Sequence, residues 1–225
     1  MVSPITGYSM LYYNFHENIQ SLVVFEVKSL KRIFIVKSST ATTSPNFSLR
    51  NIAGTSGRLD VICRSIINAF LVNGSIRREI EFYGVLEGPP NPPKTIFISG
   101  SELSYLPRDE VAMAKIVKHL LSGASASPGF HLLKIGFKKL VSNFKSRDFK
   151  LTYLHEKGSY IRDFNFDLNE EYCFILGGHL GLDLPSELFL FSLNIPCISL
   201  GSVKYLTSQC ITIVNEFLDR FHGYK

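Results

Sequence analysis

The chain has 225 residues and a formal net charge of +5, and 45% of its residues are hydrophobic and 19% charged. This composition is typical of one globular core with a small appendage and excludes a disordered or fibrous protein. The sequence has no apolar run near the ~18 residues that a membrane span needs, and its N-terminus does not resemble a secretory signal. We therefore expect a cytoplasmic protein.

Strand-like apolar runs alternate with helical periods along the chain. The strand-like runs are 21–27, 32–37, 78–86, 94–99, 149–154, 171–176 and 194–200. Helical patterns occupy 59–73, 107–121 and 184–191, and a last helix starts near Thr207 or Ser208. The segment 128–145 fits a short strand followed by a helix as well as one longer helix. The alternation predicts an α/β fold with a largely parallel sheet.

Several function classes lack their motifs. The sequence contains no P-loop, no GxGxxG after the first strand, no HExxH and no GxSxG. The histidines have no ligand spacing, so no metal site is predicted. The cysteines lack CxxC spacing and favour reduced thiols over a disulfide framework or a zinc site; they are Cys63, Cys173, Cys197 and Cys210.

Three glycine-bearing loops follow successive strand-like runs: HEKG (155–158), GGHLG (177–181) and LGSVKYLTSQC (200–210). In an open parallel sheet, ligands bind beyond the carboxyl ends of the strands, where such loops converge. Glycine also lets the backbone approach a ligand closely. Each loop alone is more simply a tight turn, but three in succession indicate a shared pocket.

Two charged constellations stand out. Asp60 and Arg64 are four residues apart on a predicted helix, which is usually a surface ion pair; the functional alternative is a carboxylate held by arginines at the mouth of a site. Further arginines flank this helix at Arg58, Arg77 and Arg78. The segment 134–150 carries six basic residues and one acid, which suits a polyanion partner or, alternatively, a face kept basic for solubility.

The sequence resembles the archaeal tRNA pseudouridine N1-methyltransferases of the SPOUT superfamily. Seven ordered segments carry the resemblance: 34–44, 47–70, 74–88, 92–103, 108–121, 174–182 and 198–220. They cover roughly 32–222. Residues 1–31 lie outside the pattern and form an N-terminal extension of unassigned role.

The resemblance implies a six-stranded α/β fold in which the SPOUT domain spans 32–225 and roughly 150–222 form a trefoil knot, an exception to the rule that chains are unknotted. It further implies the cofactor S-adenosyl-L-methionine, a tRNA partner and a homodimer packed through the knot region. The cofactor residues it implies are Leu154, Gly177, Leu200, Gly201, Ser202, Val203, Lys204, Tyr205 and Cys210.

The implied reaction is methylation of N1 of a T-loop pseudouridine in tRNA. We expect Asp60 to take the N1 proton, with Arg58 and Arg64 beside it, and we expect RNA contacts from Arg77, Arg78, Lys134, Lys138 and Lys139. Nitrogen methylation needs no covalent nucleophile, so Cys210 is expected to line the cofactor cavity. Two alternatives stay open: a pseudouridine N1-methyltransferase acting on ribosomal RNA, and a non-catalytic RNA-binding or assembly module.

Overall fold

The computed structural model describes residues 31–125, 127–167 and 169–221; the strand expected at 21–27 and nearly all of the N-terminal extension lie outside the described residues. In the described part, the main sheet has seven strands in the order β6-β5-β4-β1-β8-β7-β9. Their bounds are β1 Arg32–Ser38, β4 Ile80–Leu86, β5 Lys94–Ser99, β6 Phe130–Leu133, β7 Lys150–Tyr160, β8 Tyr172–Gly177 and β9 Cys197–Ser199.

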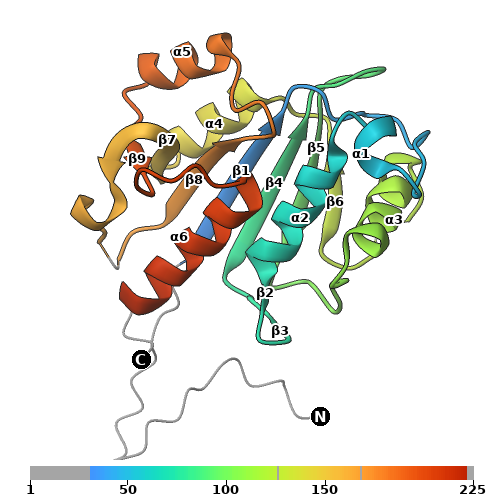
Figure 1. Cartoon of the computed structure of the whole chain (residues 1–225), viewed down its shortest axis with the longest axis horizontal. Helices are drawn as coiled ribbons and strands as arrows, with labels where there is room; N and C mark the ends of the chain where they lie inside the picture. The colour runs from blue at the N-terminus through green and yellow to red at the C-terminus, as the bar shows by residue number, and fades with distance from the viewer. Residues whose placement is uncertain (1–30, 126, 168, 222–225) are drawn as a thin grey trace, which may run out of the picture.

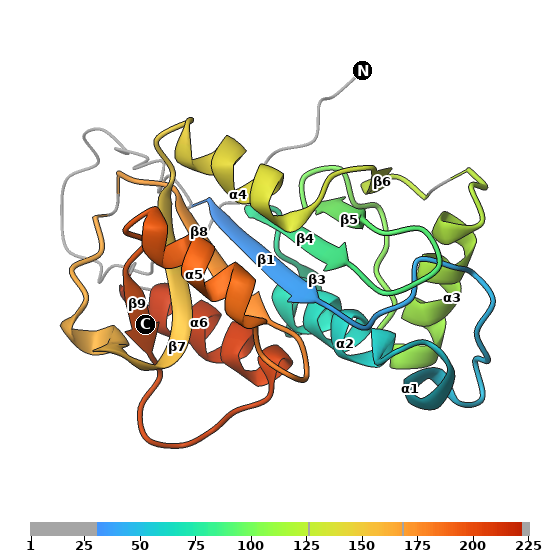
Figure 2. The same ribbon diagram turned by 90° about the horizontal axis from the view of Figure 1, so that it is seen from above.

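Helices cover both faces of this sheet (Figures 1 and 2). Helices α2, α3 and α6 pack on one face, and α4 and α5 pack on the other, which divides the core into two clusters. The helices are α1 Ile52–Thr55, α2 Leu59–Phe70, α3 Glu110–Leu121, α4 Phe137–Lys145, α5 Leu184–Ser192 and α6 Thr207–Phe221, with a 3₁₀ turn at Ile161–Asp163 and a small hairpin of β2 Leu71–Val72 and β3 Ser75–Ile76.

The largely parallel α/β sheet expected from the sequence is confirmed. Strands β4, β1, β8, β7 and β9 run parallel to one another, while β5 pairs antiparallel with both of its neighbours, β4 and β6. The sheet has one strand more than the resemblance implies, because the ambiguous segment 128–145 divides into β6 and α4. Gly136 separates the two, and the Ile135 carbonyl accepts a hydrogen bond of 2.7 Å from Thr95 Oγ1 on β5.

The C-terminal helix returns from the sheet edge to the centre of the molecule. After edge strand β9, α6 lies beside α2 (Figure 1). Two asparagine side chains join the helices, since Asn68 Nδ2 donates to the Ser208 carbonyl and Asn215 Nδ2 donates to the Ala69 carbonyl, both at 3.1 Å. The trefoil knot stays a prediction.

Candidate cofactor pocket and arginine–carboxylate cluster

A bulge in the middle of β7 lies against β9. Leu154 and Ser159 both lie opposite Ile198, so residues 155–158 bulge out of β7. A side chain on Gly158 would come within 2.6 Å of the main chain of Ile198, so the close approach of the two segments requires glycine. The Lys204 ammonium lies 3.0 Å from the Glu156 carboxylate and joins this bulge to the loop after β9 at the surface.

The loop after β8 is held from two sides. Thr207 Oγ1, at the start of α6, donates to the Gly177 carbonyl at 2.9 Å. On the other side, the Gly178 N–H donates to the Lys37 carbonyl at 2.7 Å. A Cβ on Gly177 would lie 2.1 Å from the Gly181 carbonyl carbon, so this turn admits only glycine there. The 177–181 and 200–206 loops therefore lie beyond the carboxyl ends of the parallel strands β8 and β9, where ligands bind in such sheets. Residues 155–158, expected as a third loop, instead form a bulge inside β7 that packs on β9.

The 200–206 segment offers apolar side chains and open backbone to a ligand. Gly201 has φ +113°, a conformation that L side chains rarely adopt. Within the described part of the chain, the N–H groups of residues 202–205 have no recorded hydrogen-bond partner. Three apolar side chains stand exposed here, Val203 at 60%, Tyr205 at 40% and Leu206 at 62%. Apolar walls for a flat base and free main-chain groups for its polar edge are what an adenosine needs, so these residues fit the expected cofactor.

Cys210 lies beside this segment as a neutral group. Its side chain is half-buried, and Sγ lies 3.8 Å from the Tyr205 carbonyl. Burial raises the pKa of the Cys210 thiol to about 11. Because the thiolate is the reactive form, the thiol is a poor nucleophile at neutral pH and suits the lining role expected of it.

Asp60 lies at the centre of an arginine cluster in the first turn of α2. Arg58 donates a hydrogen bond of 3.0 Å to each carboxylate oxygen of Asp60, and Arg64 Nη2 lies 2.7 Å from Oδ2. Arg64 also contacts Glu110 of α3 at 3.3 Å. Burial acts to raise the pKa of Asp60, but the hydrogen bond and charge of Arg58, with the charge of Arg64, outweigh it and lower the pKa overall.

The backbone at the start of α2 is shaped around this cluster. Gly57 and Arg58 both have positive φ, 62° and 70°. A Cβ on Gly57 would lie 1.9 Å from the Thr40 carbonyl, so the loop after β1 packs directly on the start of α2. A non-glycine residue in the left-handed region is uncommon and clusters at functional sites. Here it turns the Arg58 guanidinium back onto Asp60.

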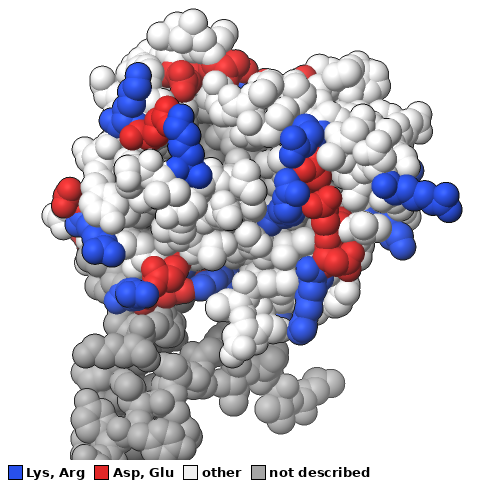
Figure 3. Space-filling model, in the orientation of Figure 1, with Lys and Arg blue, Asp and Glu red and all other residues white. Residues whose placement is uncertain are grey.

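The structure does not join the cluster to the pocket directly. In the described residues no hydrogen bond or ion pair is recorded between Arg58, Asp60 or Arg64 and the 155–158 bulge or the two loops. Figure 3 shows basic and acidic side chains next to one another on the face that carries α2 and α6. The arginines of the cluster are thus paired with acids, while 39–40% of their side-chain surface stays exposed to solvent or a ligand.

The five residues expected to bind RNA separate into two groups. Arg77 pairs with Asp219 and Glu79 and is 12% exposed, and Arg78 donates to the carbonyls of Gly100 and Leu103. Both arginines therefore have internal partners. The others are exposed on the opposite face, around the start of α4: Lys134, Lys138 and Lys139.

Sequence reasoning missed a buried lysine beside the pocket. The Lys37 side chain is 2% exposed at the end of β1; its ammonium pairs with Asp183 and lies 3.0 Å from Glu87. These residues line a cavity of about 580 Å³ under the starts of α4 and α5. The signal was present as a lone lysine inside the apolar run "FIVKSS".

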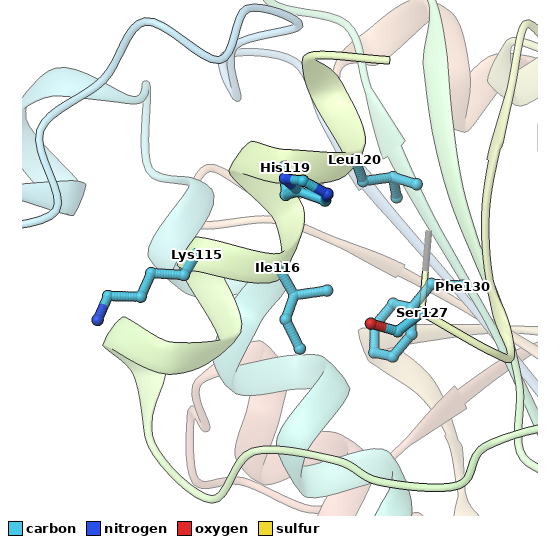
Figure 4. Close-up of a pocket in the computed structure, with 6 residues that line it drawn as sticks. All are labelled: Lys115, Ile116, His119, Leu120, Ser127 and Phe130. Carbon is cyan, nitrogen blue, oxygen red and sulfur yellow. The ribbon is translucent and has the colours of Figure 1, made fainter. Parts of the chain in front are cut away.

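A second cavity, of about 290 Å³, lies between α3 and β6, with Ile116, Leu120 and Phe130 among its lining residues (Figure 4). It is at the β6 end of the sheet, away from β7 and β9, so it is separate from the loop pocket. Among the described residues, no group of histidine, cysteine and acidic side chains is suited to holding a metal ion, and no helix has the length and apolarity to cross a membrane.

Comparison with a solved structure defines the fold class. Archaeoglobus fulgidus Nep1 bound to S-adenosylhomocysteine superposes with a TM-score of 0.59 at 14% identity, covering 85% of this chain and 98% of Nep1. At that identity the likeness defines the fold alone. The chain has the same α/β fold as that protein.

Sequence comparison then defines the family. The model of the SAM-dependent RNA methyltransferase family matches residues 31–223. A tRNA (pseudouridine(54)-N(1))-methyltransferase of Methanococcus maripaludis is 35% identical over 193 residues, covering 83% of this chain and 98% of the relative. A protein of the same name from Pyrococcus abyssi is 37% identical over 202 residues, covering 84% and 98%. The chain belongs to this family of S-adenosylmethionine-dependent RNA methyltransferases.

Proposed function

We propose that this chain methylates N1 of pseudouridine 54 in tRNA, the reaction in the names of its archaeal relatives. The observation that carries the proposal is the convergence of the 155–158 bulge with the 177–181 and 200–206 loops in a chain that spans nearly the whole length of those relatives. Because tRNA is the substrate, we place the protein in the cytoplasm.

In this proposal the loops bind and orient the cofactor. Leu154, Leu200 and Cys210 are half-buried and give the adenosine apolar contacts, and the open N–H groups of 202–205 face its polar edge. When bound, S-adenosylmethionine supplies a methyl group on a positively charged sulfur, which a nitrogen can attack in line. Alignment of the two reacting atoms provides much of the acceleration.

In this proposal the arginine cluster stabilises the negative charge that develops on the target base. Pseudouridine carries a free N1–H, and negative charge develops on the ring as that proton leaves. Arg58 and Arg64 stabilise the anion, and Asp60 orients both guanidinium groups. The lowered pKa keeps the Asp60 carboxylate ionised and able to take the proton, although its two arginine partners make it a weak base.

The proposed assembly is a homodimer through the knot region. Exposed large apolar side chains gather in the C-terminal third of the chain, where monomeric proteins rarely leave such a group uncovered. They are Tyr160, Leu180, Leu184, Leu188, Phe191, Val203, Tyr205 and Leu206. Three of them, Leu184, Leu188 and Phe191, form one stripe along α5.

Transfer of tritium from labelled cofactor tests the function. The acceptors are one tRNA transcript with pseudouridine in the T-loop, the same transcript with uridine there, and a pseudouridine-containing fragment of ribosomal RNA. We expect label only in the first. Preference for the ribosomal fragment would assign the chain to ribosomal RNA, and binding of tRNA with no label in any acceptor would make it a non-catalytic module.

A further inference from the structure

A column of three rings crosses the sheet on the face that carries α4. Tyr83 on β4, Phe97 on β5 and His131 on β6 lie directly opposite one another in the strand register. The Tyr83 and Phe97 ring centroids are 4.7 Å apart with planes at 20°, and those of Phe97 and His131 are 5.3 Å apart at 23°. The rings therefore stack in steps of about one strand spacing.

The outer end of this ring column is exposed to solvent. Within residues 31–125, 127–167 and 169–221, β6 is the edge of the sheet and no further strand continues the stack beyond His131. The His131 side chain is 44% exposed, and its Nε2 lies 2.9 Å from Glu102 Oε2, which holds the ring in place. Figure 2 shows α4 and α5 over the other end of this face, away from β5 and β6. The last ring thus presents a fixed flat surface to solvent.

Exposed basic side chains follow His131 along the chain, in the linker after β6 and on α4. Lys134 follows β6 directly, and α4 carries Lys138, Lys139 and Lys145, all exposed. Among the described residues, none of these four lysines has a recorded ion pair with a carboxylate, whereas Arg58 and Arg64 on the opposite face are paired. Lysines without carboxylate partners and an exposed aromatic ring are complementary to a nucleic acid, with its anionic backbone and flat bases.

We propose that the outer face of His131 stacks an unpaired base of the RNA substrate while Lys134 and the α4 lysines contact the adjoining phosphates. The partner follows from the proposed function, and the inference adds a second RNA contact, on the sheet face opposite the α2 arginine cluster. Proteins recognise RNA loops by stacking splayed bases on aromatic and histidine rings, and each such contact contributes substantially to affinity. The base would extend the ring column by one step.

The test compares His131→Ala with His131→Tyr in the full chain, using a pseudouridine-containing tRNA transcript. We expect His131→Ala to weaken tRNA binding about tenfold, and His131→Tyr to keep wild-type affinity because it restores a stacking ring. His119→Ala is the matched control, since His119 is also exposed but lies on α3, on the other face. Affinity for S-adenosylhomocysteine and the thermal midpoint check that each variant folds.

Fluorescence gives a second measurement that a merely structural role would not change. 2-Aminopurine is placed in turn at unpaired positions of the tRNA, and one position should be quenched by the wild-type chain and by His131→Tyr but not by His131→Ala. If His131→Ala binds tRNA like wild type, or if His131→Tyr binds tRNA as weakly as His131→Ala, then His131 does not stack a base. In either case, methyl transfer by the wild type still upholds the proposed function. If stacking holds and the wild type transfers no methyl group to any acceptor, the proposed function fails and the surface stands. A wild-type chain that does not bind tRNA overturns both.

Discussion

Arg32 on β1 and Asp219 on α6 form an ion pair in which Nη2 and Oδ1 are 2.8 Å apart and the arginine side chain is only 2% exposed. The same guanidinium donates to Asn215 Oδ1 at 3.1 Å. Arg77 pairs with the same aspartate from the segment before β4. Two guanidinium groups therefore hold one carboxylate and fasten the C-terminal helix to the first strand of the sheet.

Replacing Asp219 with asparagine should destabilise the chain by about 3 kcal/mol, because Arg32 would remain buried without its carboxylate. Urea unfolding near neutral pH measures the change. Glu216→Gln is the control on the same helix, since Glu216 and Arg220 form an ion pair at the surface with side chains 50% and 78% exposed. That change should lower the free energy of unfolding by less than about 0.5 kcal/mol. Equal losses of stability in the two variants would show that the Asp219 pair does not stabilise the fold in this way.

The Asp219 pair also predicts a pH dependence. Burial acts to raise the pKa of this carboxyl, but its hydrogen bonds with Arg77 and Arg32 and their charges lower it overall. A carboxyl with a lowered folded pKa stabilises the fold above its unfolded pKa, and that contribution is lost as pH falls through the folded value. The stability gap between wild type and Asp219→Asn should therefore be full near neutral pH and shrink below about pH 4. A gap that stays constant down to acid would exclude Asp219 as the titrating group.

The α6 network illustrates which parts of the fold local pattern can predict. Apolar spacing identified the last helix, and in the structure Ile211, Val214 and Leu218 of α6 are fully buried. The neighbouring polar residues Asn215 and Asp219 gave no sign of meeting Arg32, which lies more than 180 residues earlier. Such a contact depends on the chain returning from the sheet edge, and periodicity carries no information about that return.

The candidate site was predictable to a similar degree. The rule that ligands bind at the carboxyl ends of parallel strands located the 177–181 and 200–206 loops but not the bulge at 155–158, and the four-residue spacing located the Asp60–Arg64 pair. The sequence did not predict which charged side chains are paired inside the protein and which are exposed. Arg77 and Lys134 look alike in a sequence, yet Arg77 has internal acids and Lys134 is exposed, because partners come from distant segments.

Lys37 should position the cofactor loop. Its main-chain carbonyl accepts from Gly178, and its ammonium pairs with Asp183 at the other end of the same loop. Lys37→Met leaves the carboxylates of Asp183 and Glu87 without their shared cation, so the loop should loosen. We expect S-adenosylhomocysteine to bind about tenfold more weakly by calorimetry.

Lys139→Met is the matched control for Lys37, because Lys139 lines the same cavity but is exposed. It should leave cofactor affinity unchanged. If Lys37→Met binds S-adenosylhomocysteine as tightly as wild type while remaining folded, the lysine does not hold the loop.

Cys210→Ala should keep kcat within about threefold of wild type, because a thiol with a raised pKa takes no part in transfer to nitrogen. Affinity for the cofactor should fall modestly, since a half-buried wall of the pocket is trimmed. Single-turnover transfer at saturating RNA and cofactor measures the first effect and calorimetry the second. Cys197→Ala, on β9, serves as the control. Loss of turnover by about a hundredfold or more in Cys210→Ala alone would make the thiol a nucleophile.

Asp60→Asn should slow methyl transfer at saturating substrates by about a hundredfold, since it removes both the proton acceptor and the group that orients Arg58. The wild-type rate should be flat through the neutral range because the pKa of Asp60 is lowered and its carboxylate stays ionised. In the variant the rate should rise with pH, as hydroxide must take the N1 proton. Glu110→Gln, which removes only the second partner of Arg64, should keep most of the rate. Unimpaired transfer by Asp60→Asn would exclude the proposed role.

Reversing the charge of three lysines tests the basic strip. The triple change Lys134→Glu, Lys138→Glu and Lys139→Glu should weaken tRNA binding by more than about tenfold and lower the slope of log affinity against log salt by about 2, because each neutralised phosphate releases counterions. Affinity for S-adenosylhomocysteine should stay constant, since the strip lies on the face opposite α6. Lys115→Glu with Arg50→Glu, both exposed on the α3 side, is the control for charge reversal elsewhere, with a change in net charge of −4 against −6. If the triple variant binds tRNA with wild-type affinity and salt slope, the strip has no part in recognising RNA.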